Sequence, residues 1–339
     1  MIYRLRRRDA AVTGKFNGGT PSLHHQTAGR RRYIIRRHPA VATQKGHLMK
    51  AEWNTFPHLC HTPNGDISIR VYCYLPKGQT NELPILFYVH GLGGGNKDKG
   101  NGAEWLGTFA EEHHHVIVAP AFPRDEFPSE FYQLGTISSS WESYVPVAEE
   151  FWIYNNIEQL FDRVKGMLAS KCETYKIFGH SAGGQFVHRF LNAMPDARVS
   201  RAVAANPGSW TFPVADGKID DTGNVYGWPA TVKDTPLAED RRLKSFFARK
   251  MLVELGEADV KSLKETYATG SGGTGFMTLP GMCAQGDCRL DRGMTYWKRA
   301  HEYAASRGFD CNWELLRVPE VAHEGKKMFA AAIDWLLAD

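Results

Sequence analysis

The sequence predicts an α/β protein with a mainly parallel central sheet that helices flank on both faces. From about Ile67 onward, short apolar runs alternate with longer amphipathic stretches, which is typical of strands followed by covering helices. Several of these runs are apolar without a break, as expected of strands buried on both faces. With 339 residues, 42% of them hydrophobic and 23% charged, the chain can bury a substantial core.

Six strands are predicted from the apolar runs, and Pro120 is expected to end the second of them. They cover residues 85–89, 116–119, 175–178, 201–205, 251–255 and 313–318. Helices are predicted over residues 151–168, over an apolar stripe at 186–194 that Pro195 ends, and over a C-terminal stripe at 328–337.

The alternation of apolar runs and amphipathic stretches is absent from two segments, and no regular structure is predicted there. They are residues 124–146 and 207–240. Long loops at the carboxyl ends of parallel strands commonly form pockets. We therefore expect these loops to shape a binding site, with Trp210 as a candidate for stacking on a bound group.

The basic residues are concentrated at the N-terminus. Residues 1–48 hold nine Arg and two Lys against one acid, which gives this segment a net charge of +10. Since the net charge of the whole chain is +4, the net charge of residues 49–339 is −6. Since apolar periodicity is sparse there, residues 1–48 are predicted to be disordered and residues 49–339 to form a single domain. A targeting peptide and a nucleic-acid-binding arm are alternative roles for this segment. We favour a third interpretation, in which Met49 is the natural translation start and the start used here lies upstream of it. No nucleic-acid partner is expected, because the basic residues lie outside the domain.

No stretch approaches the roughly 18 uncharged apolar residues of a membrane-spanning helix. Without a secretory signal, we expect a cytoplasmic protein whose six cysteines are free thiols. A Cys283–Cys288 disulfide stays open. The triplet at residues 113–115, all His, is expected to lie on a solvated helix end and to bind no metal.

The strongest motif is GHSAG at residues 179–183, between the predicted strand 175–178 and the helix that follows. A strand, a sharp turn and a helix around this pattern are typical of a nucleophilic serine, here Ser181. The flanking glycines remove the Cβ atoms that would collide where strand and helix pack closely. The turn also places Ser181 at a helix N-terminus, where backbone N–H groups favour a developing negative charge.

A second glycine-rich sequence, HGLGGG at residues 90–95, follows the predicted strand 85–89. Loops at this position supply a backbone donor to the oxyanion of an acyl-transfer intermediate. Leu92 and Ala182 are therefore the predicted oxyanion-hole donors, and His90 and Gly91 are predicted to contact the substrate.

Two further residues complete a catalytic set in the required order. Asp259 follows the strand 251–255 and can orient an imidazole; a helix N-cap is its alternative role, and Glu257 is the rival acid. His323 follows the last strand and can act as general base. His180 is assigned a supporting role, because its position in the turn directs it away from the Ser181 hydroxyl.

These motifs resemble the α/β-hydrolase superfamily, in the branch of polyhydroxybutyrate depolymerase-like and feruloyl esterase-like proteins. The likeness rests on residues 179–194, 255–259 and 285–292 with the helix, strand and His323 that follow, within roughly residues 65–339. It implies an α/β-hydrolase fold and hydrolysis of a small-molecule carboxylic ester through an acyl-enzyme, with no metal or organic cofactor. Residues 320–322 depart from the usual Gly-rich turn, and residues 212–245 look longer than expected, which leaves the substrate open.

Two alternatives remain beside the esterase. An amidase or peptidase can use the same residues, and a hydrolase-like binding protein can keep the fold without the reaction. The oligomeric state stays open.

Overall fold

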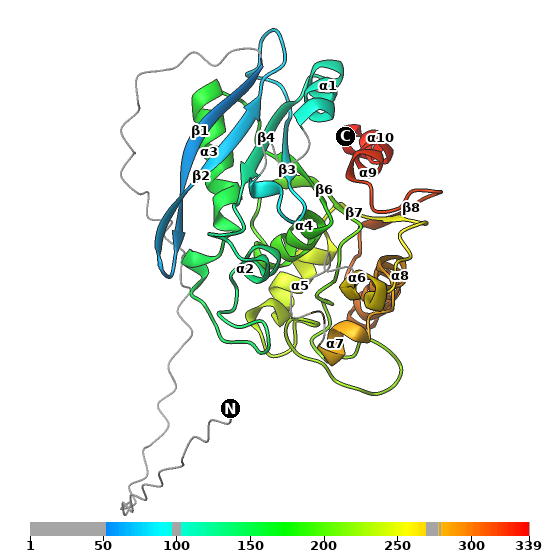
Figure 1. Cartoon of the computed structure of the whole chain (residues 1–339). Helices are drawn as coiled ribbons and strands as arrows, with labels where there is room; N and C mark the ends of the chain where they lie inside the picture. Colours follow the sequence, from blue (N-terminus) through cyan, green and yellow to red (C-terminus); the bar gives the residue numbers. More distant parts are fainter. Residues whose placement is uncertain (1–51, 97–102, 269–276, 278, 339) are drawn as a thin grey trace, which may run out of the picture. The chain divides into compact units, whose positions relative to one another are not determined.

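A computed structural model describes residues 52–96, 103–268, 277 and 279–338 (Figure 1). These residues belong to the second of the two units into which the chain divides, Met1–His47 and Leu48–Asp339. The predicted N-terminal segment and its boundary at Met49 lie outside the described residues.

The described residues form an eight-stranded sheet with the order β1-β2-β4-β3-β5-β6-β7-β8 (Figure 1). The six neighbouring strands β4, β3, β5, β6, β7 and β8 pair in parallel. Strand β2 pairs antiparallel with both β1 and β4. The predicted α/β fold with a mainly parallel sheet is confirmed. The strands are β1 (Trp53–Thr62), β2 (Gly65–Tyr74), β3 (Ile85–Val89), β4 (Val116–Ala121), β5 (Tyr175–His180), β6 (Val199–Ala205), β7 (Met251–Gly256) and β8 (Trp313–Val318).

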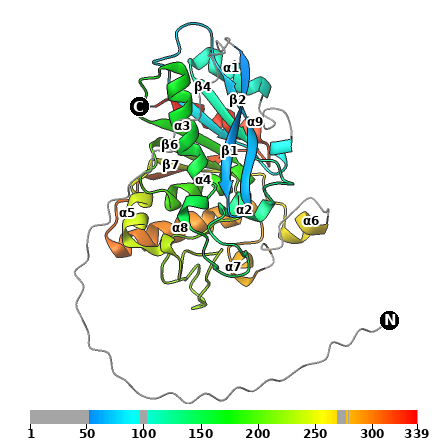
Figure 2. The ribbon, with the colours of Figure 1, turned by 90° about the vertical axis from the view of Figure 1, so that its left-hand side faces the viewer.

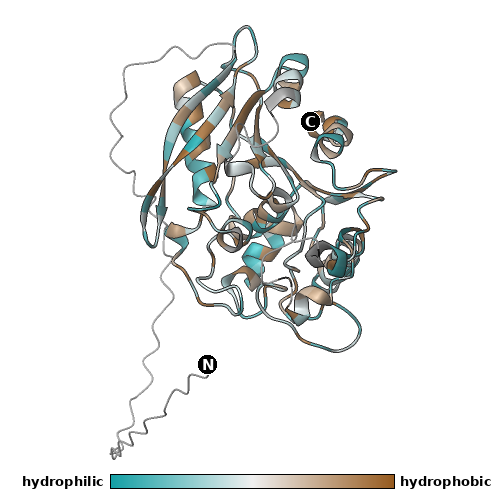
Figure 3. Cartoon of the chain, viewed as in Figure 1, coloured by the Kyte–Doolittle hydropathy of each residue, from teal (hydrophilic) through white to brown (hydrophobic). Residues whose placement is uncertain are grey.

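The β1–β2 hairpin extends the sheet beyond the predicted strands. Inward positions of β1, such as Phe56 and Cys60, alternate with exposed ones, and Figure 3 shows this ribbon banded in teal and brown. Such a half-exposed strand has no continuous apolar run to reveal it. The predicted end of β4 is also wrong, because the strand continues through Pro120, which stands opposite Val71 of β2.

Two layers of helices cover the two faces of the sheet (Figures 1 and 2). One buried cluster joins the sheet to α1, α9 and α10, and a larger one joins its other face to α3, α4, α5 and α8. The predicted helix at 151–168 begins later, after the 3-10 helix η3. The helices are α1 (Ala103–His113), α2 (Ser129–Leu134), α3 (Asn155–Leu168), α4 (Ala182–Ala193), α5 (Asp240–Phe247), α6 (Leu263–Ala268), α7 (Pro280–Cys283), α8 (Arg289–Arg307), α9 (Gly325–Ala331) and α10 (Ile333–Leu337), with 3-10 helices η1 (Gly94–Asn96), η3 (Glu149–Phe151) and η4 (Pro236–Ala238). None of the helices in the described ranges combines the length and apolarity needed to cross a bilayer.

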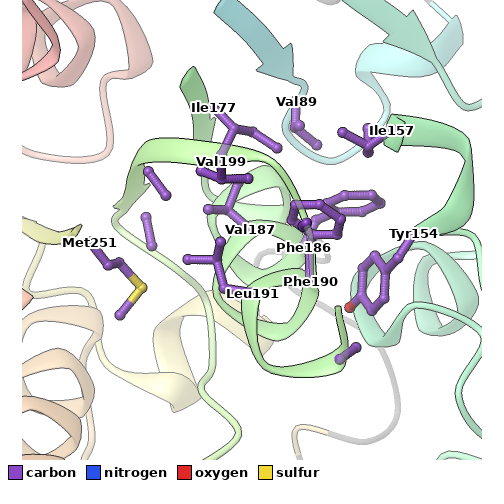
Figure 4. Close-up of a cluster of buried hydrophobic side chains, with 14 of the residues drawn as sticks. Val89, Tyr154, Ile157, Ile177, Phe186, Val187, Phe190, Leu191, Val199 and Met251 are labelled. Atoms are coloured by element: carbon purple, nitrogen blue, oxygen red, sulfur yellow. The ribbon is translucent and has the colours of Figure 1, made fainter. Parts of the chain in front are cut away.

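Helix α4 lies at the centre of the larger cluster, and all of its residues are buried. Its apolar stripe packs between the sheet and the start of α3, where the Tyr154 ring meets Phe186 edge to face at 4.8 Å (Figure 4). Burying a large apolar side chain contributes about 1.5–3 kcal/mol, so several such residues hold α4 rigidly. The labelled members of this cluster are Val89, Tyr154, Ile157, Ile177, Phe186, Val187, Phe190, Leu191, Val199 and Met251.

The two loops predicted to be irregular contain some local structure. The first holds helix α2 and a bridge between Ser138 and Pro146, and the second holds η4 and a bridge between Phe212 and Thr231. Helix α2 starts after Pro128 and ends at Gly135, whose φ is 76°, a pairing of proline before and glycine after that suits a short helix.

Candidate active site

Ser181 lies at the point where the strand order of the sheet reverses. From β3 the chain crosses to β4 on one side, and from β5 it crosses to β6 on the other. The carboxyl ends of β3 and β5 therefore flank a topological switch point, which is where open α/β sheets bind ligands. The loop at residues 90–95 leaves β3 there, and Ser181 directly follows β5.

The backbone turn at Ser181 is sharp and strained. Ser181 has φ 60° and ψ −117°, and its N–H donates to the Ala205 carbonyl at 2.9 Å. A Cβ on Gly179 would lie 2.2 Å from the Gly183 oxygen, and a Cβ on Gly183 would lie 2.1 Å from the Val89 oxygen. Since Cβ contacts below 3.0 Å are essentially never seen, only glycine fits on either side of the turn. Strain at such a position is typical of functional residues.

Ser181, His323 and Asp259 form a continuous chain of hydrogen bonds. The Ser181 hydroxyl lies 2.9 Å from His323 Nε2, and His323 Nδ1 lies 2.6 Å from Asp259 Oδ2. A carboxylate can only accept, so Nδ1 carries the proton and Nε2 is free to accept from the hydroxyl. The three residues come from the β5–α4 turn, the β8–α9 loop and the β7–α6 loop.

Asp259 is held in its ionised form although its side chain is only 3% exposed. Arg289, the first residue of α8, donates to its second oxygen at 3.1 Å. Burial raises the pKa of the Asp259 carboxyl, but the hydrogen bonds and charges of His323 and Arg289 outweigh burial and hold that pKa below its ordinary value. The rival acid, Glu257, instead forms an ion pair with Arg317.

His180 packs against the ring of His323, with 4.5 Å between ring centroids. Burial and the neighbouring His323 lower the pKa of His180 to about 3. The His180 ring therefore stays neutral at physiological pH and supports one face of the His323 imidazole.

The loop after β3 lies against the Ser181 turn. A Cβ on Gly91 would lie 3.7 Å from Ser181 Cβ, so Leu92 follows directly on this contact, while Ala182 is the first residue of α4. Within the described part of the chain, neither the Leu92 nor the Ala182 N–H donates a backbone hydrogen bond outside a helix or strand. Both groups are therefore candidates to donate to a negatively charged oxygen near Ser181.

Comparisons with known proteins agree with this architecture. Residues 62–195 match the Esterase family, described as "Putative esterase". The structure is similar to poly(aspartic acid) hydrolase-1 from Sphingomonas sp. KT-1, with 29% sequence identity and a TM-score of 0.73 over 86% of this chain and 100% of that one. It is also similar to a poly(3-hydroxybutyrate) depolymerase from Bordetella parapertussis, with 26% identity and a TM-score of 0.71 over 86% of this chain and 92% of that one.

The chain is an α/β-hydrolase of the esterase-like branch. No curated protein matches its sequence. Its family and its structural neighbours make it a hydrolase of the esterase type.

Two of the predicted substrate-binding side chains of this hydrolase lie in its interior. His90 is 2% exposed; its Nδ1–H donates to the Gly91 carbonyl and its Nε2 accepts from the Phe122 N–H. Trp210 is fully buried, with its ring stacked on Tyr296 at 4.2 Å. The assignment of these two side chains to the substrate is therefore corrected: His90 fixes the shape of its own loop, and Trp210 belongs to the core.

A buried arginine that the sequence did not single out joins the hydrolase's two long loops to α4. Arg189 is 1% exposed and donates to the carbonyl of Gln133 in the first loop. It also donates to the hydroxyls of Ser209 and Thr211 in the second. Burial lowers the pKa of Arg189 to about 10, so the guanidinium keeps its charge at neutral pH. The only sequence signal was that Arg189 is the one formally charged residue in the α4 sequence.

The cysteine pair at residues 283 and 288 and the histidine triplet at residues 113–115 make contacts within the fold. Cys283 and Cys288 are both free thiols, and Cys288 Sγ accepts from the Asp291 N–H as the N-cap of α8. His115 is buried, contrary to the predicted solvated position, and its Nδ1 bonds to the His113 carbonyl. In the described ranges, no three His, Cys, Asp or Glu side chains gather as a metal site would require.

Proposed function

We propose that this hydrolase cleaves carboxylic esters through a covalent acyl-enzyme, with Ser181 as nucleophile. The observation that carries the proposal is the chain of hydrogen bonds from Ser181 through His323 to Asp259, at 2.9 and 2.6 Å. Both distances lie within the range over which a base can take a proton from a nucleophile and be oriented by an acid.

The reaction proceeds in two acyl transfers. His323 Nε2 takes the hydroxyl proton as Ser181 Oγ attacks the ester carbonyl, and the N–H groups of Leu92 and Ala182 stabilise the resulting oxyanion. The protonated imidazole, stabilised by Asp259, then gives its proton to the departing alcohol. Water, activated by the same His323, attacks the acyl-enzyme and releases the acid.

Amide hydrolysis is the second candidate, and one observation favours it. One similar protein is named as a hydrolase of poly(aspartic acid), a polyamide, whereas the other is named as a depolymerase of poly(3-hydroxybutyrate), a polyester. The same Ser181 chemistry serves both bonds, and the leaving group decides which one is cleaved. We place the ester first because an alkoxide leaves more readily than an amide nitrogen, which needs prior protonation.

A matched pair of small substrates tests the proposal. p-Nitrophenyl acetate and p-nitroacetanilide carry the same acyl group, so their kcat/KM ratio reports ester against amide preference alone. We expect turnover of the ester, loss of that turnover in Ser181→Ala, and full activity in the control Ser306→Ala, an exposed serine on α8. Undiminished turnover by Ser181→Ala would reject the mechanism, and a faster anilide than ester would reverse the substrate order.

A further inference from the structure

One residue outside the Ser181–His323–Asp259 set contacts the segments that carry all three. Asn206 directly follows β6 and is 1% exposed. The residue before it, Ala205, accepts the Ser181 N–H at 2.9 Å. The Asn206 N–H in turn donates to the Glu254 carbonyl of β7 at 2.8 Å. Asn206 is thus fixed between the serine turn and the strand that leads to Asp259.

The Asn206 side chain joins the other two segments to each other. Its Oδ1 accepts from the Gly256 N–H at 2.7 Å, and its Nδ2 donates to the Ala322 carbonyl at 3.1 Å. Gly256 accepts the Asp259 N–H at 3.1 Å, so it closes the turn that presents Asp259. Ala322 is the residue immediately before His323.

An amide side chain suits both bonds at this position. The partner at Gly256 is a donor and the partner at Ala322 is an acceptor, so the side chain must accept on one atom and donate from the other. The backbone at Asn206 has φ 41°, a left-handed conformation that asparagine tolerates better than most residues. Geometry and backbone therefore both specify asparagine.

We propose that Asn206 is a positioning residue that sets His323 and Asp259 at their working distances from Ser181. This inference rests on the proposed function. It goes beyond that function because Asn206 touches none of the reacting atoms. Its bonds fix where the β7–α6 and β8–α9 loops leave the sheet, and the reaction depends on that placement at the level of about 1 Å.

The experiment replaces the amide without changing its size. Asn206→Asp keeps the shape but sets an oxygen against the Ala322 carbonyl. Asn206→Gly removes the side chain and suits the left-handed backbone, and it serves if the aspartate variant does not fold. The matched control is Asn156→Asp. Asn156 is also a buried asparagine whose side chain makes two hydrogen bonds, to His58 and to the Ile153 carbonyl.

For p-nitrophenyl acetate, we expect the Asn206 variants to lower kcat by about 10- to 100-fold with KM within about threefold. Labelling by a fluorophosphonate probe should slow in parallel. The Asn156 control should lose a similar amount of melting temperature but keep its kcat. If both Asn206 variants fold and keep kcat within threefold of the wild type, the bonds serve stability alone and the inference is wrong. A wild-type chain that neither turns over the ester nor takes the probe would instead reject the proposed function, and the positioning role with it.

Discussion

Gly256 is the position where a single added methyl group should disturb the active site without touching it. A Cβ there would lie 2.4 Å from the Val321 oxygen and 2.9 Å from the Ala322 oxygen. Moving the first contact out to 3.0 Å requires a shift of 0.6 Å, and reaching ordinary contact at 3.4 Å requires 1.0 Å. Both carbonyls belong to the segment that carries His323, so the imidazole moves with them.

A shift of that size should be costly for catalysis. Since misplacing a reacting group by about 1 Å can lower a rate by about 100-fold, we expect Gly256→Ala to lower kcat/KM for p-nitrophenyl acetate by about 10- to 100-fold. Overpacking should also lower the free energy of unfolding by about 1–3 kcal/mol, measured by urea denaturation.

Gly166 provides the matched control, because it lies exposed in α3 and a Cβ there meets nothing within 4 Å. Gly166→Ala should leave kcat/KM unchanged and stabilise the fold by about 0.5–1 kcal/mol. Wild-type kcat/KM in folded Gly256→Ala would refute the reasoning, because it would mean that the His323 segment can move freely without loss of rate.

Three further outcomes are expected. Burial lowers the pKa of His115 to about 4, below the ordinary value of 6.5. Between these two pH values the ring binds a proton in the unfolded chain but not in the fold, so the free energy of unfolding falls by about 3 kcal/mol as the pH is lowered from 6.5 to 4. His115→Gln should accordingly lose less stability than the wild type between pH 6.5 and 4 in urea titrations, and equal slopes would contradict the assignment. Arg289→Gln removes the charged donor from buried Asp259. It should lower the free energy of unfolding at pH 7 by about 2 kcal/mol and lower kcat, whereas Arg289→Lys should retain more of both. No difference between the two variants would argue against a role for the charge. A chain that begins at Met49 should keep the kcat/KM and melting temperature of the full chain, and loss of either would show that residues 1–48 contribute to the domain.

The central strands could be predicted from the sequence because each is buried on both faces. Strand β3, for example, is apolar and buried at every position, and such a run is visible without any knowledge of its neighbours. The β1–β2 hairpin could not be predicted in this way. Its inward positions include His58, which is buried and bonded to Asn156, so the apolar alternation is broken.

The three residues of the hydrogen-bonded chain could be chosen because each follows a predicted strand. Carboxyl ends of parallel strands meet at one edge of a sheet, so order and spacing alone placed Ser181, Asp259 and His323 together. The residues that orient them could not be chosen. Asn206 and Arg289 act through one or two side-chain hydrogen bonds between segments distant in sequence, and such bonds leave no periodic pattern. Trp210 was misassigned because an aromatic residue in a loop looks the same whether it lines a pocket or fills the core.

The most direct test of the central claim is the site of covalent labelling by a fluorophosphonate. We expect the intact mass of the wild-type chain to rise by one phosphonyl group, and peptide mapping to place that group on Ser181. His323→Ala should label far more slowly, because the hydroxyl has lost its base. Labelling at another residue, or unchanged labelling of Ser181→Ala, would contradict the account.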